Sequence, residues 1–162
     1  DSNFNVDQMK RAQALAPVTS LQPPYSAVRP GVEKEILPYC KGSGLGVLVY
    51  SPMQAGLLSG GMTRQRVDAF PSGDWRRQAE EFKEPRLTRN LALQDLLGGI
   101  AKRGGHTAAV AALAWVLRRE EVTGAIVGAR RASQVDGFIA AMEWRLTPEE
   151  IKEIDQFICR TF

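Results

Sequence analysis

The sequence predicts an α/β protein, in which helices alternate with a few strands that lie parallel in one sheet. Three observations support this fold class. First, the apolar residues alternate between helical spacing and short continuous runs. Second, these runs are rich in aliphatic and β-branched residues, as in buried strands. Third, segments long enough for a helix separate one run from the next. With 162 residues, 44% of them apolar and 24% charged, the chain fits one globular domain over residues 1–162.

The first third of the chain predicts two helices and two strands. These elements are a helix over Val6–Ala16, a strand over 17–22, a helix over Gly31–Cys40 and a strand over Leu45–Tyr50. Asn5 can cap the first helix, and Pro17 ends it because proline lacks the amide hydrogen that a helix interior needs. Pro38 should bend the second helix. The aliphatic run at 45–50 is typical of a parallel strand covered on both faces.

Residues 51–86, called here the 51–86 loop, form the longest connection in the chain. Glycine and proline recur along it around a polar and charged middle, in which Trp75–Phe82 has the spacing of a short helix. Connections of this length in compact domains are usually functional or mobile. We therefore expect a lid over a binding site.

The remainder predicts four helices and two short strands. The helices span Leu87–Lys102, Ala108–Arg118, Ala132–Met142 and Pro148–Arg160, and the strands span Thr123–Val127 and 143–146. Thr107 and Thr147 are candidate N-caps, and Glu150 completes a capping box with Thr147. The sequence thus predicts about four strands in all.

Composition argues against several classes of function. A net charge of +3, from 21 basic and 18 acidic residues, is too small for a nucleic-acid surface. No stretch approaches the roughly 20 apolar residues of a membrane span, and the amino terminus lacks the layout of a secretory signal. Cys40 and Cys159 lack metal-ligand spacing, which favours reduced thiols. We expect a cytoplasmic protein with no metal site.

Four stretches, in this order and at these distances, resemble the aldo-keto reductases. They are Ser2–Phe4, Leu21–Ser26, Val49–Met53 with Gly56–Gly60, and Ile126–Arg131 with Gln134. Members of that family fold as (β/α)8 barrels and reduce carbonyls with NADPH. The resemblance implies that the chain is a parallel β/α half-barrel, comprising strands 5 to 8 of a TIM-type barrel with their helices.

The resemblance also implies a cofactor surface at the carboxy-terminal face, where barrel loops build the site. The residues implied to bind the nicotinamide are Ser2, Asn3 and Gln22 for its carboxamide and Tyr50 for its ring. The residues implied along the pyrophosphate are Ser51, Met53 and Gln54, with the backbone of Gly56 and Leu57. Without the resemblance, Tyr50 would be read as a core aromatic at the end of a strand.

The adenosine 2′-phosphate would lie at the start of the Ala132–Met142 helix, whose dipole favours an anion. The residues implied there are Gly128, Ala129, Arg130 and Gln134. Arg130 supplies the charge that would prefer NADP over NAD. Gly137 and Phe138 stand where family members often place an acid and an asparagine, so the adenine contacts depart from the family pattern.

The family's catalytic aspartate, tyrosine, lysine and histidine belong to the amino-terminal half, so we expect no catalytic residue here. His106, the sole histidine, falls between two predicted helices. The first hypothesis is a fragment of an NADPH-dependent reductase that is inactive alone, with NADPH and a carbonyl as ligands of the full-length parent. The alternative is a non-catalytic nucleotide-binding or structural module that self-associates or completes an amino-terminal half, because an open half-barrel leaves sheet edges exposed.

Overall fold

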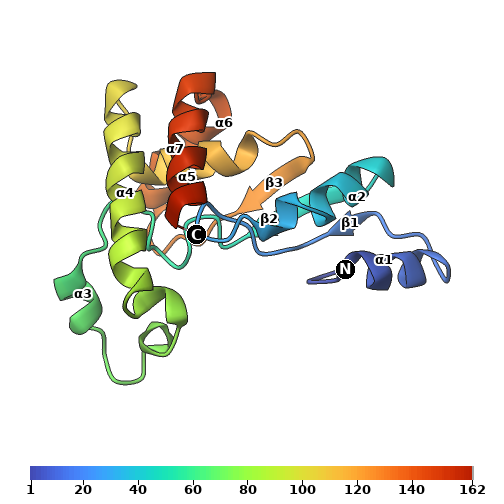
Figure 1. Ribbon diagram of the computed structural model, residues 1–162, viewed down its shortest axis with the longest axis horizontal. Coiled ribbons are helices and arrows are strands. Elements are labelled where there is room, and N and C mark those ends of the chain that lie inside the picture. The colour runs from blue at the N-terminus through green and yellow to red at the C-terminus, as the bar shows by residue number, and fades with distance from the viewer. Residues whose placement is uncertain (162) are drawn as a thin grey trace.

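A computed structural model describes residues 1–161 and places a parallel sheet at the centre of the chain (Figure 1). The strands are β1 (Ser20–Leu21), β2 (Gly46–Tyr50) and β3 (Val122–Ile126), in the order β1-β2-β3. Val47 of β2 pairs with Val122, and Tyr50 pairs with Ile126. The predicted α/β class with parallel strands is confirmed.

Seven α-helices accompany the sheet within residues 1–161. They are α1 (Val6–Gln13), α2 (Ile36–Gly42), α3 (Arg64–Asp68), α4 (Arg86–Arg103), α5 (Ala108–Leu117), α6 (Ala132–Glu143) and α7 (Pro148–Thr161). Three short 3-10 turns also occur, η1 (Gly31–Glu33), η2 (Trp75–Arg77) and η3 (Glu80–Phe82). The expected longer helices are present, whereas the short helix expected over Trp75–Phe82 is replaced by the two 3-10 turns η2 and η3. A short helix that the sequence pattern did not predict, α3, lies earlier in the 51–86 loop.

The strand predicted at residues 143–146 was wrong. Trp144 caps the end of α6, where its N–H donates to Ala140 O at 2.8 Å. Thr147 then opens α7, where its Oγ accepts from Glu150 N at 3.2 Å and its own N–H donates to the Glu150 carboxylate. The backbone groups of residues 144 and 147 are thus used by the end of α6 and the start of α7, so too few residues remain between them for a strand.

A fourth parallel segment occurs instead at the start of the chain. Ser2 forms an isolated parallel bridge with Gln22, just beyond β1. Gln22 N donates to Asp1 O at 2.8 Å, and Asn3 N donates to Gln22 O at 3.1 Å. Residues 1–3 therefore continue the sheet on the side of β1 that lies away from β2.

Proline explains why two other elements are shorter than predicted. The predicted Gly31–Cys40 helix divides into η1 and α2, and Pro38 lies in the first turn of α2. The amide groups of a first turn have no partner within the helix, so proline is tolerated there without a kink. The strand predicted over 17–22 contracts to the two residues of β1, which begins three residues after Pro17.

The core is built around α5, which contacts α4, α6 and β3. Its residues 108–116 are all buried, and most of them are alanine or valine. Small side chains allow close packing of the neighbouring elements, while Trp115, 1% exposed, fills the remaining space. Alanine in this helix thus reflects burial on several sides.

A partly buried polar network joins the loop after β1 to α5 and α7. Arg118 donates to the Tyr25 hydroxyl at 2.8 Å and to Glu33 at 3.0 Å, and its guanidinium lies 3.7 Å from the centre of the Trp115 ring. Trp115 Nε1 donates to Asp155 of α7 at 3.0 Å. Burial raises the pKa of the Tyr25 hydroxyl, which therefore stays protonated.

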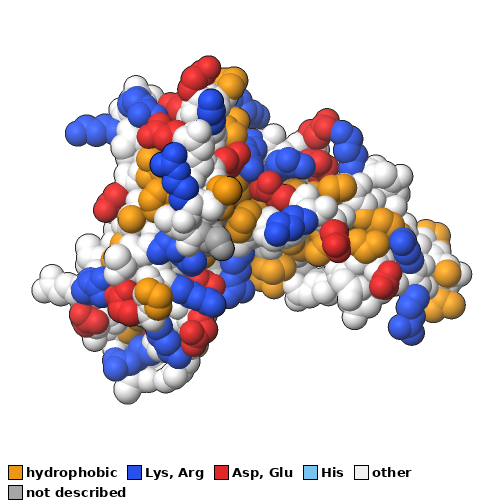
Figure 2. Space-filling model, in the orientation of Figure 1, with side chains coloured by type: hydrophobic (Ala, Val, Ile, Leu, Met, Phe, Trp, Pro, Cys, Tyr) orange, Lys and Arg blue, Asp and Glu red, His pale blue; other side chains and the backbone are white. Residues whose placement is uncertain are grey.

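The face of the molecule seen in Figure 2 carries basic and acidic side chains interspersed. It has no continuous surface of one sign, in keeping with the net charge of +3. No helix within residues 1–161 is long and apolar enough to cross a membrane.

Candidate cofactor site

The carboxy-terminal ends of the parallel segments meet at one edge of the sheet. Ser2 bridges Gln22, Pro24 bridges Tyr50, and Tyr50 pairs with Ile126. Neighbouring parallel strands end on the same side, so the residues that follow them converge. Most of the residues implied to bind the cofactor lie at or just after these ends.

The four residues implied to bind the nicotinamide lie together. Tyr50 donates from its hydroxyl to Asn3 Oδ1 at 2.9 Å, and Ser2 Oγ donates to Gln22 O at 3.3 Å. Asn3 has a positive φ of 61°, a conformation that asparagine adopts more readily than most residues. Tyr50 is half-buried, while the other three residues are exposed.

The turn after β2 contains an unusual run of left-handed backbone. The φ angles are 56° at Ser51, 47° at Gln54, 53° at Ala55 and 88° at Gly56. For residues other than glycine this conformation costs roughly 1–2 kcal/mol each. Such outliers cluster at ligand-binding turns, where the surrounding structure holds them in place.

Within this turn, two of the implied pyrophosphate residues are core residues. Met53 and Leu57 are 8% and 0% exposed. The N–H groups of Gly56 and Leu57 donate inside the turn, to Met53 O at 3.2 Å and Gln54 O at 3.0 Å. The side chain of Ser51 is exposed and that of Gln54 is half-buried, with its Oε1 accepting from Ser26 Oγ at 3.4 Å. Ser51 and Gln54 therefore offer the side chains nearest to solvent.

After β3, the chain forms an exposed loop that leads into α6. Gly128, Ala129 and Arg130 are all exposed. Gln134 Oε1 accepts from Arg130 N at 2.7 Å and from Arg131 N at 3.1 Å. The side chain of Gln134 thus orders the loop, and the start of α6 faces the same region as Arg130.

The 51–86 loop approaches this region through Asp74. Arg76 Nη2 donates to Asp74 at 2.5 Å, and this hydrogen bond is the main cause of a pKa lowered to about 2 at the Asp74 carboxyl. The positive charge of Arg130 lowers the same pKa further. Arg130 therefore lies close enough to Asp74 to act on it electrostatically, a proximity that the sequence pattern did not reveal.

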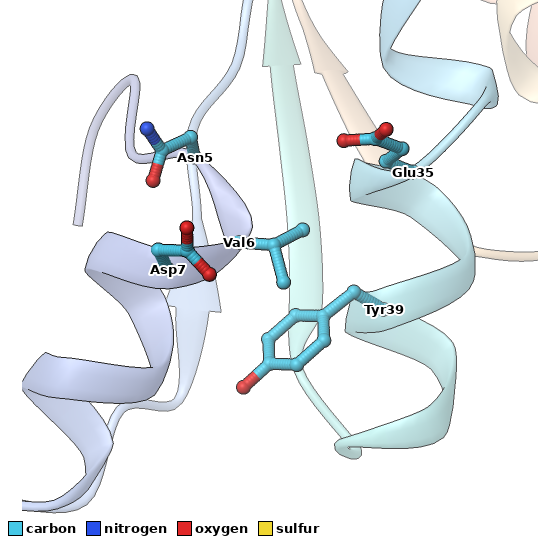
Figure 3. A pocket seen from close by; sticks show the side chains of 5 residues that line it. All are labelled: Asn5, Val6, Asp7, Glu35 and Tyr39. Atoms are coloured by element: carbon cyan, nitrogen blue, oxygen red, sulfur yellow. The ribbon is translucent and has the colours of Figure 1, made fainter.

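A separate open hollow of about 470 Å³ lies between α1 and α2 (Figure 3). It is lined by Asn5, Val6, Asp7, Glu35 and Tyr39. In Figure 3 the Val6 side chain points between the two helices toward the Tyr39 ring. None of the residues implied to bind the cofactor lines this hollow.

His106 lies between α4 and α5, as the sequence predicted. Its ring packs against Trp144, with ring centres 4.6 Å apart. The backbone is close-packed here, because a Cβ on Gly104 would meet Trp144 Nε1 at 3.0 Å. His106 is thus a packing residue at a helix connection, away from the ends of the strands.

Comparison with known proteins identifies the family. The sequence profile of the Aldo/keto reductase family matches residues 2–158. This chain belongs to the aldo/keto reductase family. The resemblance drawn from the four sequence stretches is therefore confirmed.

Two curated relatives cover almost the whole chain. Aldo-keto reductase YhdN from Bacillus subtilis is 32% identical over 161 residues, which are 99% of this chain and 48% of that protein. Probable aldo-keto reductase 1 from Glycine max is 30% identical over 153 residues, 94% of this chain and 43% of that protein. The chain spans about half the length of the curated relatives it matches.

Solved structures give the same proportion. The glycerol dehydrogenase AKR11B4 from Gluconobacter oxydans is 35% identical and superposes with a TM-score of 0.90, covering 99% of this chain and 48% of that one. A thermostable aldo-keto reductase, Tm1743, is 23% identical with a TM-score of 0.68, covering 96% of this chain and 46% of that one. The second match supports the fold alone. The sheet and helices therefore correspond to part of an aldo-keto reductase structure.

Proposed function

We propose that this chain is the cofactor-binding half of an NADPH-dependent aldo-keto reductase that interconverts a carbonyl and an alcohol. Its parallel segments would be strands 5 to 8 of the barrel, and the catalytic residues would lie in a preceding half. The observation that carries this proposal is the convergence of Ser2, Asn3, Gln22 and Tyr50 at one edge of the sheet. The match to the Aldo/keto reductase family supports the proposed carbonyl–alcohol chemistry. The coverage of about half of each relative supports the assignment of this chain to one half of the barrel.

The residues present fit a nicotinamide group. A carboxamide has one acceptor and one donor pair, and the hydroxyl of Ser2 with the amides of Asn3 and Gln22 offers matching partners. The Tyr50 hydroxyl is held by Asn3 at 2.9 Å, which restrains the ring that would stack on the nicotinamide. The cofactor, when bound, supplies the hydride. The role of these four residues would be to fix which face of the ring is presented.

The loop between β3 and α6 favours a phosphorylated cofactor. Arg130 is exposed, and Gln134 holds the N–H groups of Arg130 and Arg131 at the start of a 12-residue helix. An arginine and the positive end of a helix dipole both stabilise an anion. We therefore assign NADP rather than NAD, with Ser51 and Gln54 facing the pyrophosphate.

Titration of the chain with NADPH and with NADH, followed by cofactor fluorescence, tests this proposal. We expect saturable binding of NADPH, and binding of NADH weaker by about tenfold or more, because a single charge-assisted contact contributes roughly 1.5–3 kcal/mol. No binding of either cofactor at millimolar concentration would show that the half-site is inert. Equal affinity for both would remove the assignment of NADP.

A second candidate function is a non-catalytic module that binds nucleotide and self-associates or completes a separate amino-terminal half. The observation that favours it is an open apolar groove lined by α5, β3 and α6. Exposed apolar surface of this kind marks a site for another polypeptide. Both cysteines, Cys40 and Cys159, are free thiols, which supports a cytoplasmic location for either function.

A further inference from the structure

We propose that Tyr25 is a positioning residue for Tyr50, the side chain proposed above to stack on the nicotinamide ring. This inference rests on the proposed cofactor site and extends it inward, to a support for Tyr50 that is anchored on α5. Tyr25 is 1% exposed, so it would act through Tyr50 and would not contact the cofactor itself.

The first link is the backbone of Tyr50, the last residue of β2. Its N–H donates to Pro23 O at 3.1 Å, and its carbonyl oxygen accepts from Tyr25 N at 3.2 Å. Pro24, between these two partners, forms a parallel bridge with Tyr50. A shift of residues 23–25 would therefore move the Tyr50 backbone and the ring attached to it.

The second link is the side chain of Tyr25, which ties residues 23–25 to α5. Its hydroxyl donates to Glu33 at 2.5 Å and accepts from Arg118, at the end of α5, at 2.8 Å. Arg118 is held in turn, because it donates to Trp115 O at 2.9 Å and its guanidinium lies 3.7 Å from the centre of the Trp115 ring. The support of Tyr50 thus ends on a helix whose residues 108–116 are all buried.

The ring of Tyr25 could be packed without its hydroxyl. Its centre lies 5.4 Å from the centre of the Trp115 ring, and a phenylalanine would fill the same space. Apolar packing has little directional preference, whereas hydrogen bonds to two charged groups favour a single position of the side chain. The hydroxyl therefore fixes where Tyr25 lies, and with it the backbone of residues 23–25.

The backbone directly after Tyr50 is the reason why this residue needs support. Ser51 has a φ of 56°, a left-handed conformation that is unfavourable for a residue with a side chain. Such conformations persist only where the surrounding structure holds the neighbouring backbone. Asn3 holds the Tyr50 hydroxyl at 2.9 Å, but Asn3 is itself exposed. The buried Tyr25 is thus the restraint that joins Tyr50 to the core.

NMR spectra of the full chain with labelled tyrosine rings, recorded without cofactor, test the positioning. The sequence contains three tyrosines, Tyr25, Tyr39 and Tyr50, so substitution of each by phenylalanine assigns the ring signals that disappear. We expect Tyr25→Phe to shift and broaden the signals of Tyr50. The reason is that the Tyr50 ring would then exchange between positions instead of occupying one.

Tyr39→Phe is the matched control. It removes the same atom, in this case a hydroxyl of α2 that donates to Gln13 of α1 at 2.6 Å. The Tyr50 signals should keep their wild-type positions in this variant. Tyr50 signals that stay unchanged in Tyr25→Phe, or that change equally in both variants, overturn the proposal.

Titration with two ligands measures the consequence for binding. We expect Tyr25→Phe to weaken NADPH binding about three- to tenfold, because a ring that is no longer held must be ordered when the cofactor binds. The affinity for adenosine 2′,5′-bisphosphate, which lacks the nicotinamide, should stay at the wild-type value, since this ligand would bind at Arg130 and Gln134. Equal losses of affinity for both ligands would indicate a general structural role and overturn the proposal.

The cofactor assignment and the positioning of Tyr50 can fail separately. A wild-type chain that binds no NADPH contradicts the cofactor assignment, while Tyr50 signals that respond to Tyr25→Phe and not to Tyr39→Phe still support the positioning. Conversely, NADPH binding by a chain whose Tyr50 signals do not respond to Tyr25→Phe contradicts the positioning alone.

Discussion

At the scale of single residues, the candidate cofactor surface depends on a few polar contacts, including one between segments distant in sequence. Tyr50 reaches Asn3, 47 residues earlier, and Gln134 folds back onto Arg130 and Arg131. These hydrogen bonds hold the side chains of Asn3 and Tyr50 and the backbone of residues 130–131 in place. The side chains that would recognise the cofactor are therefore held in position before it binds, which lowers the entropy cost of binding.

Arg130→Ala should weaken NADPH binding roughly 10- to 100-fold and leave NADH binding unchanged. The reason is that the guanidinium would pair with the 2′-phosphate, a contact of about 1.5–3 kcal/mol that NADH cannot make. Fluorescence titration with both cofactors measures the effect. Arg160→Ala removes the same charge from the last turn of α7 and serves as the control. A parallel loss of affinity for NADH would assign Arg130 to general folding.

Arg118→Met should lower the free energy of unfolding by about 1–3 kcal/mol, since it removes a charge-assisted partner from the part-buried Glu33 carboxylate and Tyr25 hydroxyl. Arg118 is 11% exposed and joins Tyr25, Glu33 and Asp155. Urea denaturation followed by circular dichroism measures the change. Lys41→Met, which removes the exposed ion pair with Glu120, should have no measurable effect. Equal shifts for both variants would contradict the structural role of Arg118.

At the scale of elements, the 51–86 loop is fastened to α4 at both of its ends. Near its start, Gln94 accepts from Gly60 N at 3.0 Å and from Met62 N at 3.1 Å, and it donates to Met62 O at 2.9 Å. Near its end, the backbone oxygen of Glu81 accepts from the buried Asn90 Nδ2 of α4 at 2.9 Å. The loop is thus attached at two points, and the segment between them approaches Arg130 through Asp74.

Gln94→Leu should release the start of the loop and lower the free energy of unfolding by about 3 kcal/mol, because three backbone groups lose their partner. We expect faster tryptic cleavage at Arg64 or Arg66, which lie directly beyond the released residues. Asp95→Leu makes a similar polar-to-apolar change at the next, exposed position of α4. If both variants are cleaved at the same rate, Gln94 does not anchor the loop.

At the scale of the whole molecule, the chain presents the candidate cofactor surface at the carboxy-terminal ends of its parallel segments and an open apolar groove along α5, β3 and α6. We expect the chain alone to oxidise no NADPH in the presence of an aldehyde. In the proposed function the catalytic residues would lie outside this chain, and the one histidine of the chain, His106, is packed against Trp144. Steady-state absorbance at saturating NADPH measures this. Turnover well above a protein-free control would contradict the division of binding and chemistry between two halves.

Sequence patterns predicted most of the helices and both longer strands, because each depends on local spacing of apolar residues. They misplaced the fourth parallel segment, since residues 1–3 are too short to carry a period and acquire strand geometry only from Gln22. They also missed α3, whose five residues hold one buried side chain, Val67. Short elements are decided by their neighbours rather than by their own sequence.

For the candidate site, too, the sequence predicted one part and missed another. Motifs in the sequence supplied the residues implied to bind the cofactor, but could not show which of their side chains reach the surface or which of their N–H groups are already engaged. Burial of Met53 and Leu57, and the engaged N–H groups of the turn, emerged from the packing. The approach of Asp74 to Arg130 likewise depends on how a long loop is fastened.

By itself, the sequence determined the α/β class, the order of the main elements and the family, because periodicity and motifs are written in neighbouring residues. Only the tertiary structure decided which parallel segments adjoin, which implied site residues reach the surface, and where apolar surface is left open. Those properties arise from contacts between residues far apart in the chain. Such contacts follow from packing the whole chain at once, and no local pattern contains them.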